Sequence, residues 1–139
     1  MKLENQVAIV TGAGRNIGEQ IAHLLSSEGA RIAVVDLDAD RGAAVASDIS
    51  AAGGDAASFV ADVADSDDVK NLVSGVVERF GRVDILVNNV AISDNRNILE
   101  ITEEEWDRTI AVTLRSPFLM TKYVATQMVN QGDGGKIVN

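Results

Sequence analysis

The chain has 139 residues, of which 46% are hydrophobic and 24% charged, enough for one globular domain, residues 1–139, with a substantial buried core. Its formal net charge of −9 argues against nucleic acid and anionic membrane surfaces as partners. Cysteine is absent, which excludes disulfides, thiolate catalysis and cysteine-based metal sites.

Residues 1–6 lack the apolar core of a signal peptide, and no run approaches the ~18 apolar residues of a membrane span, so we expect a cytoplasmic protein with no membrane partner. From residue 7 onward, short apolar runs rich in Val and Ile occur without alternating polar residues. Such runs are typical of strands buried on both faces of a parallel sheet. The predicted strands are residues 7–10, 32–35, 56–61, 83–87 and 136–138.

Helical patterns occupy the segments between these strands. The first helix ends at Gly29 and the second covers about 39–52. The third begins at Asp65 or Ser66 as N-cap and stops at Gly81. The apolar face of the first helix is expected to consist of Ile17, Ile21, Leu24 and Leu25. That of the third is expected to consist of Val69, Leu72, Val73, Val76, Val77 and Phe80.

The fourth predicted helix is the longest, about residues 103–131. Thr102 and Glu105 have the spacing of a capping box at its start. The acidic residues there fit the positive end of the helix dipole better than a metal ion, and we expect no metal site. Pro117 lies inside this helix, and because proline lacks an N–H group we expect a bend or a local loss of hydrogen bonding.

Strands and helices therefore alternate along the whole chain. Because crossovers between parallel strands are right-handed, this order predicts an α/β fold, a doubly wound parallel sheet (Rossmann fold) with helices on both faces. The strand order is expected to reverse between the first and fourth strands, with a cleft at their carboxyl ends. Several segments that follow strands should converge on this cleft: residues 11–18, 36, 62 and 88–89.

The segment Thr11–Gly18, with the sequence TGAGRNIG, is the most informative part of the chain. Gly12 and Gly14 allow a tight turn and a close backbone approach to a pyrophosphate, and Gly18 allows the following helix to pack against the sheet. The helix start adds free N–H groups and a positive dipole end. Asp36, after the second strand, lies where two ribose hydroxyls need an acceptor. Together these features predict a dinucleotide site.

The same segments resemble the short-chain dehydrogenase/reductase family, and the resemblance covers the whole chain. The family turn TGxxx(A/G)xG corresponds to Thr11–Gly18, with Asn16 at the Ala or Gly position, a residue that also enters left-handed backbone conformations. Asp62-Val63 is similar to the family's Asp-Val pair, which holds adenine, and residues 88–91 (NNVA) are similar to its NNAG motif. The candidate cofactor-binding residues are Gly12, Gly14, Arg15, Asn16, Ile17, Gly18, Asp36, Asp62, Val63, Asn88, Val90 and Ala91.

The resemblance implies an NAD(P)-dependent oxidoreductase that transfers hydride between its cofactor and a small alcohol or carbonyl substrate. Thr113 occupies the position of a family Asn that supports a proton relay. The family's catalytic Ser and YxxxK pair follow the start of the fifth strand, where these 139 residues stop, and Tyr123 has Gln127 rather than Lys four residues on. We therefore expect a truncated Rossmann domain that is the cofactor-binding portion and is inactive alone.

Asp36 predicts NAD rather than NADP, because its carboxylate accepts hydrogen bonds from both ribose hydroxyls and repels a 2′-phosphate. Leu37 and Asp38 follow it, so no basic residue comes directly after this strand. Arg15 in the glycine turn is the opposing signal, since relatives that prefer NADP often have a basic residue there. NAD is favoured, and NADP is the alternative.

Two other functions fit the sequence: a non-catalytic NAD-binding module, and a protein-interaction module that keeps the fold without its chemistry. In the family, the fourth helix pairs with a partner subunit. We therefore expect a homo-oligomer through the 103–131 helix. Its apolar contact residues are predicted to include Ile110, Leu114, Tyr123 and Val124.

Overall fold

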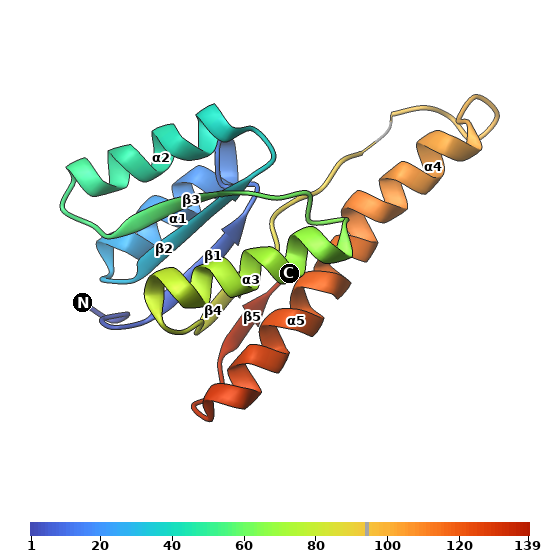
Figure 1. The fold of residues 1–139 in the computed structure, drawn as a ribbon. Coiled ribbons are helices and arrows are strands. Elements are labelled where there is room, and N and C mark those ends of the chain that lie inside the picture. The colour runs from blue at the N-terminus through green and yellow to red at the C-terminus, as the bar shows by residue number, and fades with distance from the viewer. Residues whose placement is uncertain (94) are drawn as a thin grey trace.

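The computed structural model describes residues 1–93 and 95–139. Within them, five parallel strands form one sheet in the order β3-β2-β1-β4-β5 (Figure 1). The strands are β1 (Val7–Thr11), β2 (Arg31–Asp36), β3 (Ala56–Val60), β4 (Ile85–Val87) and β5 (Lys136–Val138). β1 lies between β2 and β4, so the strand order reverses there, and the predicted doubly wound α/β fold is confirmed.

Helices cover both faces of this sheet. Their bounds are α1 (Asn16–Ser27), α2 (Ala39–Ala51), α3 (Ser66–Phe80), α4 (Glu103–Ile110), η1 (Ala111–Arg115) and α5 (Ser116–Gln131). α1 and α2 pack on one face, and α3 and α5 pack on the other (Figure 1). No helix in the described residues has both the length and the apolar character needed to cross a bilayer.

Alternate residues of β1 face two separate cores, because successive side chains of a strand point to opposite faces. Val7 and Ile9 pack with residues of α3 and α5, whereas Ala8 and Val10 pack with residues of α1 and α2. All four side chains are fully buried. The prediction of a strand covered on both faces is therefore correct for β1.

β3 departs from that prediction because it is an edge strand. The sequence predicts a strand over 56–61 buried on both faces, but β3 ends at Val60 and its residues are only partly buried or exposed. Within residues 1–93 and 95–139, β3 pairs only with β2 and has no neighbouring strand on its outer side. Val60 is consequently 60% exposed.

The buried face of α1 consists mainly of small residues. The periodic pattern assigns Ile17 and Leu24 to this face, but both are exposed, and Gly18 and Ala22 are buried instead. Small residues bring α1 close to the sheet, so the larger side chains lie towards the outside of the helix. The remaining two predicted positions do pack against the core: Ile21 and Leu25.

The ends of α3 lie where the sequence predicts them. Asp65 is the N-cap, and its Oδ1 accepts hydrogen bonds from Asp67 N at 2.9 Å and Asp68 N at 3.0 Å. Gly81 ends the helix with a φ of 84°, which glycine adopts without the steric cost of a Cβ.

The predicted 103–131 helix is a continuous helical run in three parts. Its capping box is present, with Glu105 N donating to Thr102 Oγ1 at 3.1 Å and Thr102 N donating to Glu105 Oε2 at 2.9 Å. The disturbance expected near Pro117 takes the form of the π-helical segment η1. Proline has no N–H group and its ring crowds the carbonyl four residues earlier, which explains a wider turn there.

The apolar residues expected on the outside of this run are divided between its surface and the core. Ile110 and Leu114 are exposed, as expected. Tyr123 is half-buried and packs against the core under α3. Val124 is fully buried in that core, so the prediction was wrong for this residue.

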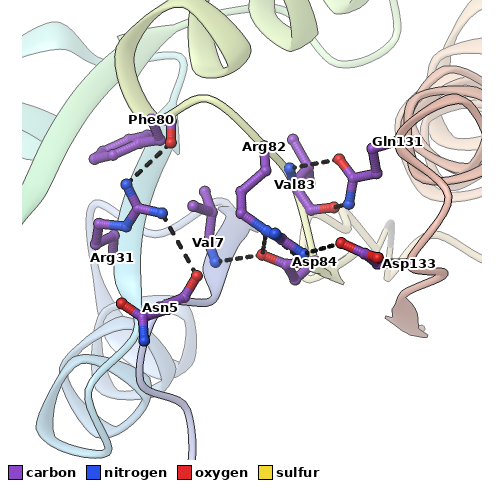
Figure 2. Close-up of polar contacts among 9 residues, drawn as sticks. All are labelled: Asn5, Val7, Arg31, Phe80, Arg82, Val83, Asp84, Gln131 and Asp133. Carbon is purple, nitrogen blue, oxygen red and sulfur yellow. Dashed lines mark hydrogen bonds and ion pairs between the residues drawn. The ribbon is translucent and has the colours of Figure 1, made fainter.

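A polar network joins the elements at the amino ends of the strands (Figure 2). Asp84, just before β4, accepts hydrogen bonds from Val7 N at 2.9 Å and from the Arg82 guanidinium at 2.7 to 3.0 Å. The Gln131 side chain bonds both backbone groups of Val83, donating to the carbonyl at 2.7 Å and accepting from the N–H at 3.2 Å. These bonds connect β1, β4 and the end of α5.

Candidate functional site

At the carboxyl ends of β1, β2 and β4 lies a groove with two adjoining hollows of about 280 and 430 Å³. Both hollows are lined by Gly12, Asp36 and Val90, one residue from each of three chain segments. One hollow or the other is also lined by the predicted residues Arg15, Asn16, Ile17, Asp62, Val63 and Ala91. The structure thus brings together most of the segments that the sequence predicts to converge.

The glycine turn has no room for a side chain at Gly14 or Gly18. A Cβ on Gly14 would lie 2.6 Å from Asp36 Oδ2, and a Cβ on Gly18 would collide with the carbonyl of Gly12. Gly12 itself has a φ of 63°, in the left-handed region. Asn16 adopts the same region with a φ of 54°, as its residue type allows. Gly18 therefore permits close backbone packing, Gly14 permits the close approach of the Asp36 and Arg41 side chains, and Gly12 and Asn16 supply left-handed backbone.

The start of α1 differs from the starts of three other helices. The N-caps of α2, α3 and α4 are Asp38, Asp65 and Thr102, and each accepts a backbone N–H with its side chain. The N-cap of α1 is Arg15, which makes no side-chain capping bond. Backbone N–H groups and the positive dipole end of α1 are thus available to an anion in the groove.

Asp36 is buried and its carboxylate is held by several donors. Oδ2 accepts from Gly14 N at 2.9 Å, and Oδ1 accepts from Asp38 N at 2.9 Å and from Arg41 Nη2 at 3.2 Å. Burial raises the pKa of Asp36. The backbone hydrogen bonds and Arg41 lower this pKa by more than burial raises it, so the pKa lies below its ordinary value. The carboxylate is therefore ionised at neutral pH.

Thr11 and Asn89 hold the glycine turn against the segment after β4. Thr11 Oγ1 accepts from Asn89 N at 3.0 Å and from Val90 N at 3.3 Å. Asn89 Nδ2 donates to the carbonyls of Thr11 at 3.1 Å and Gly12 at 3.3 Å, and Asn89 lines the larger hollow. Asn89 was not among the predicted cofactor residues, although its place beside Asn88 in the NNVA segment is a usable signal.

Asn88 points to a different part of the molecule. Its Nδ2 donates to Thr121 Oγ1 at 3.3 Å and to Asn139 Oδ1 at 2.7 Å, and its backbone N–H donates to Val138 O at 2.9 Å. The amide therefore links β4 to α5 and to the end of β5. The structure does not bring this side chain into the groove with Asp36.

Asp62 and Val63 line the smaller hollow as predicted. Asp62 is exposed, and its Oδ1 accepts a hydrogen bond from Ala64 N at 2.9 Å. Val63 is buried beside it and forms part of the apolar wall. A polar edge next to an apolar wall suits a flat ring such as adenine.

Thr113, which the sequence resemblance predicts at a proton-relay position, holds the segment after β4. Its Oγ1 donates to Ile92 O at 2.8 Å and accepts from Ile92 N at 3.1 Å. Ile92 lines the larger hollow, so Thr113 acts on the groove through this backbone contact. Thr113 belongs to η1, where the helix widens.

The groove is rich in arginine although the chain is acidic. Arg15, Arg41 and Arg108 line its larger hollow, in which Asp36 is the only carboxylate among the residues that the structure describes. Sequence reasoning missed Arg41, which follows Asp36 by five residues, and Arg108, which comes from α4. Arg108 is 72 residues from Asp36 in the sequence, so only the tertiary structure brings it to this hollow. Clustered guanidinium groups favour a ligand with phosphate groups.

The chain is similar in sequence to known proteins. The short chain dehydrogenase family matches residues 6–139. An uncharacterized oxidoreductase of Thermotoga maritima is 42% identical over 139 residues, which are 100% of this chain and 54% of that protein. Galactitol 2-dehydrogenase of Agrobacterium fabrum is 42% identical over 140 residues, covering 100% of this chain and 53% of that protein.

A solved structure agrees with these relatives. A metagenomic short-chain oxidoreductase in complex with NADP has a TM-score of 0.92 and 38% identity, covering 99% of this chain and 62% of that one. The chain spans about half the length of the curated relatives it matches. The family binds nicotinamide dinucleotides, and the glycine turn, open helix start and arginines fit such a group. Because the family matches residues 6–139 and the groove has the features of a dinucleotide site, the chain belongs to the short chain dehydrogenase family.

Proposed function

We propose that these residues form the cofactor-binding portion of an NAD(P)-dependent oxidoreductase that acts on an alcohol or carbonyl substrate. The observation that carries the proposal is the uncapped start of α1, which faces an arginine-lined groove directly after a turn that has no room for a side chain at Gly14. A bound nicotinamide would supply the hydride donor or acceptor, and the groove residues would bind and orient it. The relative named galactitol 2-dehydrogenase supports an alcohol as the substrate class.

NAD is the cofactor that we propose as preferred. Asp36 supports this preference because its buried, ionised carboxylate lies at the end of β2, where it would accept a hydrogen bond from a ribose hydroxyl and repel a 2′-phosphate. The relative in complex with NADP supports NADP as the alternative. Gly12, Gly14 and Gly18 would admit the pyrophosphate.

These residues alone are expected to bind the cofactor without turnover. Tyr123 is the only tyrosine of the chain, and its hydroxyl lies 3.2 Å from Ser66 Oγ at the contact of α3 with α5. The tyrosine and lysine of the family's YxxxK pair therefore have no counterpart among the described groove residues. An assay with NAD and a simple alcohol should give no rate above background.

A fluorescence titration with NADH tests the binding proposal. The unmodified chain should bind NADH, and Gly14→Ala should weaken binding by at least roughly tenfold, because the new methyl group displaces Asp36. Gly75→Ala is the control, since its methyl group in α3 would meet only the Phe59 ring, at 3.3 Å. Absence of NADH binding, or equal binding by the two variants, would contradict the proposed function.

We also propose self-association through the 103–131 helix. Its exposed apolar residues include Trp106, Leu114 and Phe118, which are 53%, 64% and 60% exposed. Apolar side chains at this density on one helical run favour burial against another surface. Light scattering should give the parent chain a mass above the 14.7 kDa of a monomer, and Phe118→Glu should bring the mass closer to 14.7 kDa. A parent chain that is monomeric would contradict this proposal.

A further inference from the structure

Arg41 lies in the groove although it belongs to the first turn of α2. Its side chain is 40% exposed and packs over the glycine turn, since a Cβ on Gly14 would lie 2.8 Å from Arg41 Cβ. Its Nη2 lies 3.2 Å from Asp36 Oδ1. Arg41 therefore contacts both the glycine turn and the carboxylate of Asp36, which is proposed to bind the adenosine ribose.

The guanidinium of Arg41 is only partly satisfied. Its Nε lies 3.7 Å from Asp38 Oδ2, which is too far for a hydrogen bond. Within the described part of the chain, this Nε is buried and has no hydrogen-bond partner. A buried donor without an acceptor destabilises the folded state, so Arg41 has unused capacity that an acceptor in the groove would fill.

Asp36 has fewer free hydrogen-bond acceptor positions than its place at the end of β2 implies. Oδ1 already accepts from Asp38 N and from Arg41, and Oδ2 already accepts from Gly14 N. Each carboxylate oxygen accepts two hydrogen bonds, so one position remains, on Oδ2. As held here, Asp36 would accept one ribose hydroxyl rather than both, unless Arg41 moves away.

We propose that Arg41 is a specificity-determining residue that adapts the adenosine-ribose pocket to a 2′-phosphate. Facing a 2′-hydroxyl, the guanidinium stays on Asp36. Facing a 2′-phosphate, it turns from Asp36 to the phosphate oxygens, together with Arg15 of the same hollow. The repulsion by Asp36 is then offset, and NADP binds within roughly tenfold of NAD. This inference rests on the proposed dinucleotide function.

Titrations of NADH and NADPH into the 139-residue chain and two variants test this role. Arg41→Gln should weaken NADPH binding by roughly tenfold or more and change NADH binding by less than about threefold, because a charge-assisted contact to phosphate is lost. Arg79→Gln is the control, since it removes the same charge from an ion pair with Asp55 that does not line the groove. Equal weakening of both nucleotides by Arg41→Gln, or an unchanged ratio, would overturn the inference.

A second measurement needs no variant and remains decisive if Arg41→Gln does not fold. AMP and adenosine 2′,5′-bisphosphate are used to displace NADH from the unmodified chain, and their Kd values should agree within roughly tenfold. A preference for AMP above roughly a hundredfold would overturn the role of Arg41. If NADH does not bind at all, the proposed function fails first, so the two failures are distinguishable.

Discussion

The two ends of the sheet each hold a buried aspartate paired with an arginine, and the two pairs differ in how completely they are bonded. Asp84 at the amino end and Asp36 at the carboxyl end are both 7% exposed. Arg82 meets both oxygens of Asp84 at 2.7 to 3.0 Å, and this pairing raises the pKa of Arg82. Arg41 meets one oxygen of Asp36 at 3.2 Å.

This difference separates a structural site from the proposed binding site. At the amino end, side chains of Arg82, Asp84 and Gln131 use their donors and acceptors on the chain itself (Figure 2). At the carboxyl end, the start of α1 has no side-chain cap and Arg41 Nε has no partner within the described residues. Hydrogen-bonding capacity is thus retained where a ligand would use it.

The largest expected effect is on stability, from Asp84→Ala. The change leaves Val7 N and Arg82 without their buried acceptor, which should lower the free energy of unfolding by about 2–4 kcal/mol. Urea unfolding followed by circular dichroism measures it. Asp133→Ala removes the more exposed partner of Arg82 and should cost less than ~1 kcal/mol. Similar losses in the two variants would mean that the amino end is not the structural site described above.

A smaller effect, on specificity, is expected from Asp36→Asn. The variant keeps the shape of the side chain but removes its charge, so the preference for NADH over NADPH should fall by roughly tenfold. The ratio of the two Kd values from fluorescence titration is the measurement. Asp55→Asn, a carboxylate on another surface that pairs with Arg79, should leave the ratio unchanged. An unchanged ratio in Asp36→Asn would remove the argument for NAD.

The smallest expected effect is a pH dependence of stability. The pKa of Asp36 lies below its ordinary value of 3.8, so the ionised form favours the folded state. Its stabilising contribution is fully present well above pH 3.8 and is lost as the pH falls through the lowered folded-state pKa. The difference in free energy of unfolding between the parent chain and Asp36→Asn should therefore narrow on acidification below that value. A difference that widens would contradict the lowered pKa.

Local features were the most predictable from the amino-acid order. The capping box at Thr102 and the glycine stop at Gly81 were predicted, and the N-cap of α3, predicted as Asp65 or Ser66, is Asp65. Each depends on contacts within one helical turn. The effect of Pro117 was also predictable, since it follows from the missing N–H group. The π-helical form of η1 was not predictable, because the sequence pattern does not indicate how the backbone rearranges when a hydrogen bond is lost.

Features that depend on distant segments were predicted less well. The sequence does not distinguish Asn88 from Asn89, yet one amide bonds Thr121 and the other bonds Gly12. Alternation along an extended segment sends neighbouring side chains to opposite sides, and only the surrounding elements decide which side is the groove.

The order of apolar runs, glycines and caps was sufficient to predict the α/β alternation and the glycine turn of the groove, since these follow from backbone conformation and periodicity along the chain. The family was predicted from the resemblance of the Thr11–Gly18, Asp62-Val63 and NNVA segments to its motifs. The packing of the elements established the rest. It exposed β3 at the sheet edge, and it brought Arg41 and Arg108 beside Asp36. It also left Arg41 Nε without a hydrogen-bond partner among the described residues, because burial and hydrogen bonding arise between segments far apart in the chain.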